Sequence, residues 1–215
     1  MASHLHTQSR FGMACLLAQV LAHGAGAQVS SALSASTRWD ASEAAADAAL
    51  PSMSFSDASR REQRAPASAA GSIRPRFSTD DRGRQVVSFE IPEGTSLYGT
   101  GENAGPLLRN GRVVEAWNTD AYGYREETRS LYQSHPWVLA VRADGTAFGV
   151  LADTTWRCEI DLSDGIRFAA EGPAYPVLVY EGATPEEVLK KLASDIGTIE
   201  LPPLWALGYH QCRYS

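Results

Sequence analysis

Short apolar runs recur about every ten residues from Arg76 to Tyr180, and polar turn signals separate them. The runs are rich in Val, Ile, Phe and Trp, which favour strands. Glycine-containing turns lie between them, for example DRGR at 81–84 and SDG at 163–165. This spacing predicts a mainly β fold, an antiparallel β-sandwich. The predicted strands are residues 76–80, 85–91, 113–117, 137–142, 147–153, 157–161, 166–170 and 176–180.

One helix is predicted after the strands, over about residues 185–196. Thr184 can cap it, Pro185 suits its first position, and Glu187 completes a capping box. Apolar residues then recur at helical spacing until Gly197, which is typical of a helix end. We therefore expect residues 76–200 to form a sandwich domain that ends with this helix.

The last residues, 201–215, differ from the sandwich. Two prolines form a stiff connector at 202–203, and an apolar segment, LWALG at 204–208, follows them. We interpret this segment as the first strand of a second domain. An unpaired apolar strand of this kind would invite aggregation, as expected of an inactive remnant.

The first 75 residues lack the apolar pattern. Residues 1–27 fit a secretory signal peptide, with an apolar stretch at 11–22 and small residues before Gln28. This predicts a secreted or periplasmic protein. The alternative is an Ala-rich extension or a mis-assigned start, which would leave the protein cytoplasmic. Residues 28–75 contain few residues to bury, so we expect a disordered linker, with Trp39 and Phe55 too isolated to nucleate a core.

Charge and composition exclude some functional classes. The net charge is −6 overall. Residues 1–85 carry nine Lys/Arg against seven Asp/Glu, and the remainder carries ten against eighteen. An acidic folded region without basic clusters argues against nucleic acid or an anionic membrane as a partner. No stretch reaches the length of a transmembrane helix.

The three cysteines and the histidines offer no metal or redox motif. Cys15, Cys158 and Cys212 lack C-x-x-C spacing, and free thiols are favoured, although a Cys158–Cys212 pair stays open. His135 and His210 have no partner at ligand spacing. We expect no metal and no cofactor.

Three segments place aromatic rings beside side-chain oxygens: residues 98–102 (YGTGE), 117–122 (WNTDAY) and 131–136 (LYQSHP). An aromatic ring can lie on the C–H face of a sugar while carboxylates and amides accept its hydroxyls. The segments therefore predict saccharide binding.

These segments, with residues 149–156, 182–185 and 202–210, occur in an order that resembles the N-terminal part of family 31 glycoside hydrolases, the α-glucosidase and α-xylosidase group. The resemblance extends over about residues 77–215. It implies a β-sandwich followed by a (β/α)₈ barrel, and hydrolysis of O-glycosyl bonds with retention. It also implies that the catalytic carboxylates lie beyond Ser215, so that this chain is an N-terminal fragment with no catalytic residue of its own. The implied partners are an α-linked oligosaccharide or α-glycoside and the missing barrel.

The resemblance also assigns two substrate-binding residues. Asp120 matches a loop aspartate that accepts sugar hydroxyls, and Tyr132 matches a tyrosine near the next sugar. The alternatives are an Asx-turn or an ordinary loop residue for Asp120 and a buried tyrosine bonded to backbone for Tyr132. The whole chain has an alternative too, a stand-alone, non-catalytic carbohydrate-binding module.

Other residues of these segments have structural interpretations. Glu102 is expected to brace a turn or to pair with an arginine such as Arg109. Four aromatic residues could form a stacking platform, but core or hinge packing is favoured for them: Trp117, Tyr122, Tyr124 and Trp137.

Overall fold

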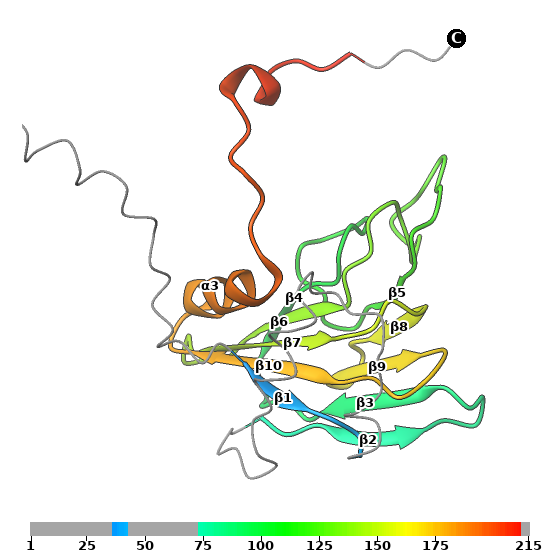
Figure 1. Cartoon of the computed structure of the whole chain (residues 1–215). Coiled ribbons are helices and arrows are strands. Elements are labelled where there is room, and N and C mark those ends of the chain that lie inside the picture. Colours follow the sequence, from blue (N-terminus) through cyan, green and yellow to red (C-terminus); the bar gives the residue numbers. More distant parts are fainter. Residues whose placement is uncertain (1–35, 43–72, 212–215) are drawn as a thin grey trace, which may run out of the picture. The chain divides into compact units, whose positions relative to one another are not determined.

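The computed structural model describes residues 36–42 and 73–211, which form a β-sandwich with one α-helix (Figure 1). One sheet has the strand order β1-β10-β7-β6-β4 and the other the order β2-β3-β9-β8-β5, and every pairing is antiparallel. The bounds are β1 Thr37–Trp39, β2 Arg76–Thr79, β3 Gln85–Phe89, β4 Ser96–Gly99, β5 Val113–Ala116, β6 Trp137–Val141, β7 Ala147–Ala152, β8 Cys158–Asp161, β9 Ile166–Ala170 and β10 Val177–Gly182.

The core lies between the two sheets, because successive side chains of a strand point to opposite faces. In β10, Val177 and Val179 join the core between the sheets. Leu178 and Tyr180 point the other way, into a second cluster beneath the helix. The central strands of this sheet are thus buried on both faces, which explains the continuous apolar run of β7.

Helix α3 (Pro185–Ile196) covers the outer face of the sheet that contains β6, β7 and β10 (Figure 1). The Thr184 side chain accepts a hydrogen bond from the backbone N–H of Glu187, and Pro185 stands in the first turn. Val188 and Leu192 are its buried residues. The predicted helix is confirmed over the same residues.

All eight predicted strands are confirmed, but two strands were not predicted. The first, β1, lies in the segment expected to be a disordered linker, and Trp39 packs against the core rather than being isolated. Its partner is β10, with Thr37 opposite Val179, and local composition contains no signal for so distant a pairing. The second, β4, is a four-residue edge strand. Residues 1–27 and Phe55 lie outside the described residues.

The strand predicted at 204–208 is wrong. Leu204–Leu207 forms a 3-10 helix, and no strand follows it up to residue 211. A strand needs a neighbour for its backbone hydrogen bonds. No strand pairs with this segment among the described residues, and it makes local bonds instead, from Ala206 N–H to Pro203 O and from Gly208 N–H to Trp205 O. In the described part of the chain, no helix is long and apolar enough to cross a membrane.

Cys158 is a free, fully buried thiol, and Cys212 lies outside the described residues. Burial raises the pKa of the Cys158 thiol to about 12. In the unfolded chain the thiol ionises near its usual pKa of about 8.5. The folded state therefore disfavours the thiolate, and the stability that the protonated thiol confers is complete below about pH 8.5 and is lost as the pH rises towards 12.

Cys158→Ala will consequently flatten the alkaline loss of stability. At pH 10 the parent chain should lose about 2 kcal/mol of unfolding free energy, relative to pH 8, that the variant keeps. Urea denaturation of both proteins at pH 8, 9 and 10 measures the difference. Tyr175 is present in both proteins; its pKa is raised first by burial and second by Cys158, so the burial effect is common to both proteins. Parallel pH profiles would contradict the prediction.

Candidate functional site

The two segments that carry the predicted substrate residues lie side by side. Thr119 N–H donates to Leu131 O at 2.7 Å, and Ser134 N–H donates to Asn118 Oδ1 at 2.9 Å. The Thr119 and Ser130 hydroxyls are 2.6 Å apart, and both donate to the carbonyl of Trp117. These bonds fix both ends of the intervening loop against the sandwich.

Asp120 directly follows Thr119, and Tyr132 directly follows Leu131, the two residues that this backbone hydrogen bond joins. Asp120 is exposed, and no described residue donates a hydrogen bond to its carboxylate. The alternative of an Asx-turn is therefore not formed. Tyr132 is half-exposed rather than buried. Both side chains are accessible to a ligand.

A tight turn at residues 99–101 lies against residues 133–137, which follow Tyr132. Gly99, Thr100 and Gly101 all have positive φ, at 97°, 72° and 79°. Glycine adopts this conformation at little cost, whereas threonine rarely does. The turn lets Thr100 N–H donate to Trp137 O at 2.8 Å, so that it lies directly against the chain entering β6.

Glu102 completes this support. Its backbone N–H donates to Gln133 O at 2.9 Å, and its carboxylate accepts from Gln133 N–H at 3.0 Å. The prediction that Glu102 braces a turn is confirmed, and the pairing with Arg109 is not seen. Arg109 is buried and donates instead to the carbonyls of Asn103 and Ala104, and burial lowers its pKa.

The aromatic residues divide into two groups. Trp137 is buried under α3, edge-on to Tyr180 with ring centroids 5.5 Å apart, as core packing predicted. For the other three, core packing is not seen, because Trp117, Tyr122 and Tyr124 are 48%, 99% and 58% exposed, and their packing at a hinge stays a prediction. Tyr122 and Tyr124 lie in the loop between the two paired segments and therefore have no core to enter.

A hollow of about 390 Å³ lies beside the paired segments. It is lined by Ala116, Trp117, Asn118, Ser134, Pro136, Thr154, Thr155 and Trp156. Asp120 and Tyr132 do not line it. Sequence reasoning placed Trp156 only within a family motif and did not assign it to a site, because nothing local connects it with Trp117.

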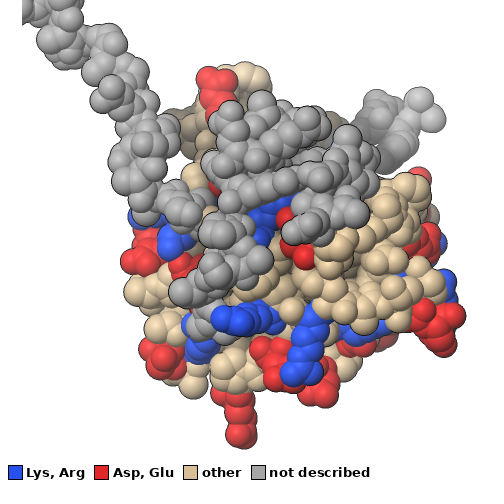
Figure 2. Space-filling model, turned by 60° about the horizontal axis from the view of Figure 1, so that its bottom comes forward, with Lys and Arg blue, Asp and Glu red and all other residues tan. Residues whose placement is uncertain are grey.

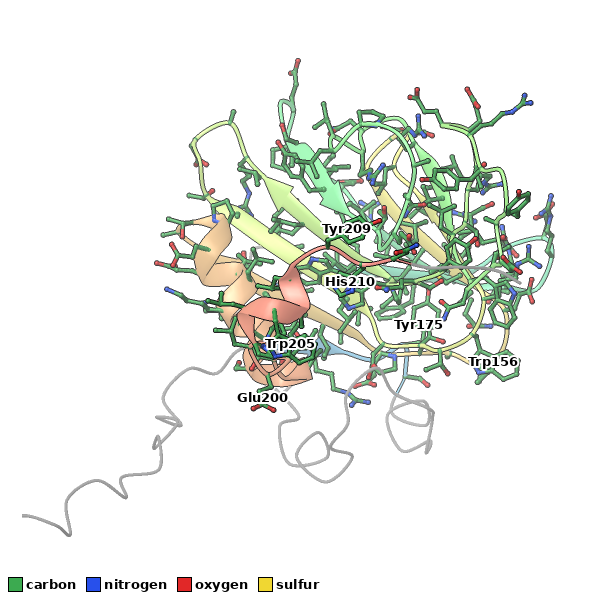
Figure 3. All side chains as sticks on the ribbon, turned by 90° about the horizontal axis from the view of Figure 1, so that it is seen from above. Trp156, Tyr175, Glu200, Trp205, Tyr209 and His210 are labelled. Carbon is green, nitrogen blue, oxygen red and sulfur yellow. The ribbon has the colours of Figure 1, made fainter. Side chains whose placement is uncertain are left out.

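The remaining candidates serve the structure. His135 is partly buried, and this burial lowers its pKa. His210 Nε2 is 2.6 Å from the carbonyl of Ala206 within its own segment (Figure 3). Across residues 36–42 and 73–211, no three His, Cys, Asp or Glu side chains are placed to hold a metal ion.

Charged side chains on the visible face are interspersed rather than separated by sign (Figure 2). One ion-pair network joins the turn between β2 and β3 to β8 and β9. Arg84 lies 2.8 Å from Asp80 and 3.4 Å from Glu159, and Arg129 lies 2.8 Å from Glu159. Arg167 joins the same two carboxylates.

The family model described as "Glycosyl hydrolase 31 N-terminal galactose mutarotase-like domain" matches residues 34–161. The chain belongs to this family. The match begins before β1, which agrees with the core position of Trp39. The predicted resemblance to family 31 is thereby confirmed, as is the mainly β sandwich.

Curated relatives of this family 31 chain include Alpha-glucosidase 2 of Bacillus thermoamyloliquefaciens, 43% identical over 136 residues, which are 61% of this chain and 17% of that protein. Alpha-xylosidase XylQ of Lactiplantibacillus pentosus is 31% identical over 58% of this chain and 16% of its own length. This chain therefore spans about a sixth of the length of these relatives.

Solved structures of family 31 enzymes are also similar to this chain. The Family 31 alpha-glucosidase from Bacteroides thetaiotaomicron matches with a TM-score of 0.57 and 48% identity, over 64% of this chain and 24% of that one. The Flavobacterium johnsoniae GH31 dextranase complexed with isomaltotriose matches with a TM-score of 0.55 and 25% identity, over 62% of this chain and 16% of that one.

Proposed function

We propose that this family 31 chain forms one wall of the substrate pocket of a retaining α-glycosidase. The observation that carries the proposal is the anchored loop, in which Asp120 is exposed and accepts no hydrogen bond from a described residue. A carboxylate in this state can accept two sugar hydroxyls, and such charged hydrogen bonds are the stronger kind. Tyr132, which is half-exposed, supplies a ring and a phenol for the same ligand.

The segment after α3 supports the second part of the proposal, a following barrel domain in the same polypeptide. Six large apolar residues within eleven positions are 64% to 90% exposed: Ile199, Leu201, Leu204, Trp205, Leu207 and Tyr209. Apolar clusters of this kind are usually covered by another folded surface. Figure 3 labels Trp205 and Tyr209 in this segment.

The mechanism proposed for the whole enzyme needs two carboxyl groups about 5–5.5 Å apart, one acting as nucleophile and the other as acid/base. We assign neither to this chain and place both in the barrel. The role of Asp120 and Tyr132 is to bind and orient the sugar, and no cofactor takes part. We also propose a secreted or periplasmic location, in keeping with the leader-like residues 1–27.

Asp120→Asn tests the assignment in the full-length enzyme. The amide keeps the shape of the carboxylate but loses the charge, so kcat/KM for an α-glucoside should fall by about tenfold or more. Asp164→Asn, an exposed residue of the turn between β8 and β9, is the matched control and should leave kcat/KM unchanged. If Asp120→Asn retained kcat/KM within about threefold, less than 1 kcal/mol, the assigned role would be wrong.

A further inference from the structure

The hollow beside the loop has the construction of a ligand site. Three segments far apart in the sequence form it: the end of β5 with residues 117–118, the approach to β6 at 134–136, and the connection from β7 to β8 at 154–156. It thus lies where strands of both sheets end. Its volume of about 390 Å³ falls in the range of roughly 300–1,000 Å³ of small-molecule pockets.

Trp156 is held with part of its indole ring accessible. Gly172 lies against one face of the ring, since a Cβ at that position would be 2.6 Å from Trp156 Cδ2. The backbone N–H of Trp156 donates to Thr154 Oγ1 at 3.2 Å. The guanidinium of the next residue, Arg157, donates two 2.8 Å hydrogen bonds to the Glu115 carboxylate. The side chain nevertheless remains 48% exposed, and Figure 3 labels it at the edge of the domain. A ring that is fixed on one side loses little conformational entropy when a ligand covers the other.

The backbone of Trp117, directly after β5, is also fixed by hydrogen bonds. The backbone N–H of Trp117 donates to Glu115 O at 3.1 Å, and its backbone carbonyl accepts from the Thr119 and Ser130 hydroxyls. It too is 48% exposed.

The chemistry of the remaining lining residues selects the ligand. None of the eight lining residues is charged. A phosphate, nucleotide or carboxylate ligand would call for a cation here. The polar groups are an amide and hydroxyls, from Asn118, Ser134, Thr154 and Thr155. Neutral donors and acceptors beside aromatic rings suit a neutral polyhydroxylated ring with an apolar C–H face.

We propose that this hollow binds one neutral pyranose ring of an oligosaccharide. Trp156 and Trp117 contact its C–H surface, and Asn118 and Thr155 exchange hydrogen bonds with its hydroxyls. The proposal does not depend on the roles given to Asp120 and Tyr132, because neither residue lines the hollow.

Indole signals in ¹H–¹⁵N NMR spectra of this 215-residue chain test the proposal site by site. The chain has five tryptophans, which single Trp→Phe variants assign. Titration with maltotriose, and separately with isomaltotriose, should shift the Trp117 and Trp156 signals saturably and leave buried Trp137 unchanged. Sorbitol, an acyclic polyol, should produce no saturable shift.

Trp156→Ala should raise the Kd by about tenfold or more, as expected when one aromatic contact of a small site is removed. Trp205→Ala, which removes an exposed indole outside the hollow, is the matched control and should leave the Kd unchanged. Asp164→Asn, an exposed residue of the turn between β8 and β9 that lines neither proposed site, should also leave it unchanged.

Three outcomes would overturn the proposal: no saturable shift at Trp117 and Trp156 in the parent chain, an equal response to sorbitol, or an unchanged Kd in Trp156→Ala. Circular dichroism shows whether Trp156→Ala is folded. If Trp156→Ala does not fold, the titration of the parent chain and the Kd of Trp117→Ala test the proposal instead.

Discussion

Replacing Gly149 by alanine will lower the free energy of unfolding by about 3 kcal/mol. Gly149 lies in the middle of β7, opposite Leu139 of β6 and Tyr180 of β10. A Cβ there would stand 1.9 Å from Cη2 of Trp137 and 2.6 Å from Cζ2. One added methyl group therefore requires the indole ring to move.

The ring has no free space to move into. Trp137 is buried, packs edge-on against Tyr180, and shares its cluster with Val188 and Leu192 of α3. Displacing it loosens the helix from the sheet, because interiors are close-packed and respond to small volume changes. The added methyl group therefore lowers stability by disturbing the packing of α3 on the sheet, and not only by shifting the atoms next to Gly149.

Urea denaturation measures the loss, and two further variants identify its cause. Gly145→Ala places a methyl group where nothing lies within 4 Å, at a φ of +84°, so it reports backbone strain alone at about 1 kcal/mol. In the double variant Trp137→Leu/Gly149→Ala, the combined loss should be smaller than the sum of the single losses, because the clashing ring is absent. Additive losses would contradict the proposed clash.

The strands and the helix differ in how clearly the sequence predicts them. Each predicted strand has a run of alternating or continuous apolar residues long enough to read, and the helix has a complete capping box. In contrast, β1 has three residues and becomes a strand only because β10, from the far end of the chain, offers its edge. The segment at 204–207 shows the reverse case, apolar residues typical of a strand with no strand beside them.

The candidate site was predictable only in part. Asp120 and Tyr132 came from the family resemblance, and their exposure needed the structure because turn chemistry alone favours an Asx-turn at Asp120. The hollow could not be predicted, since Trp117 and Trp156 are 39 positions apart and meet only because β5 and β8 pair. What could have suggested it is that both tryptophans lie next to polar residues at strand ends, Trp117 before Asn118 and Trp156 after Thr155.

Gly101→Ala will have the largest effect on the proposed substrate loop. Its φ is +79°, and a Cβ would stand 2.7 Å from the amide nitrogen of His135 and 2.9 Å from the carbonyl oxygen of Gln133. Both are backbone atoms, so no side chain can rotate away and the whole segment must shift. The bond from Glu102 N–H to Gln133 O would be strained or lost.

The shift moves Tyr132 and Ser134 relative to the segment that carries Asp120. A displacement of about 1 Å in groups that position a substrate can cost about a hundredfold in rate, so we expect a loss of that order in kcat/KM of the full-length enzyme. The unfolding free energy should fall by about 2 kcal/mol through backbone strain and the weakened hydrogen bond.

Gly111→Ala is the matched control for this change. Its φ of +77° is nearly the same as that of Gly101, but nothing lies within 4 Å of the added methyl group. It should cost about 1 kcal/mol of stability and leave kcat/KM unchanged. If both variants lost activity equally, strain or global stability would explain the loss, and the turn at 99–101 would have no part in positioning the loop. Activity lost only in Gly101→Ala would tie substrate turnover to the contact between this turn and residues 133–135.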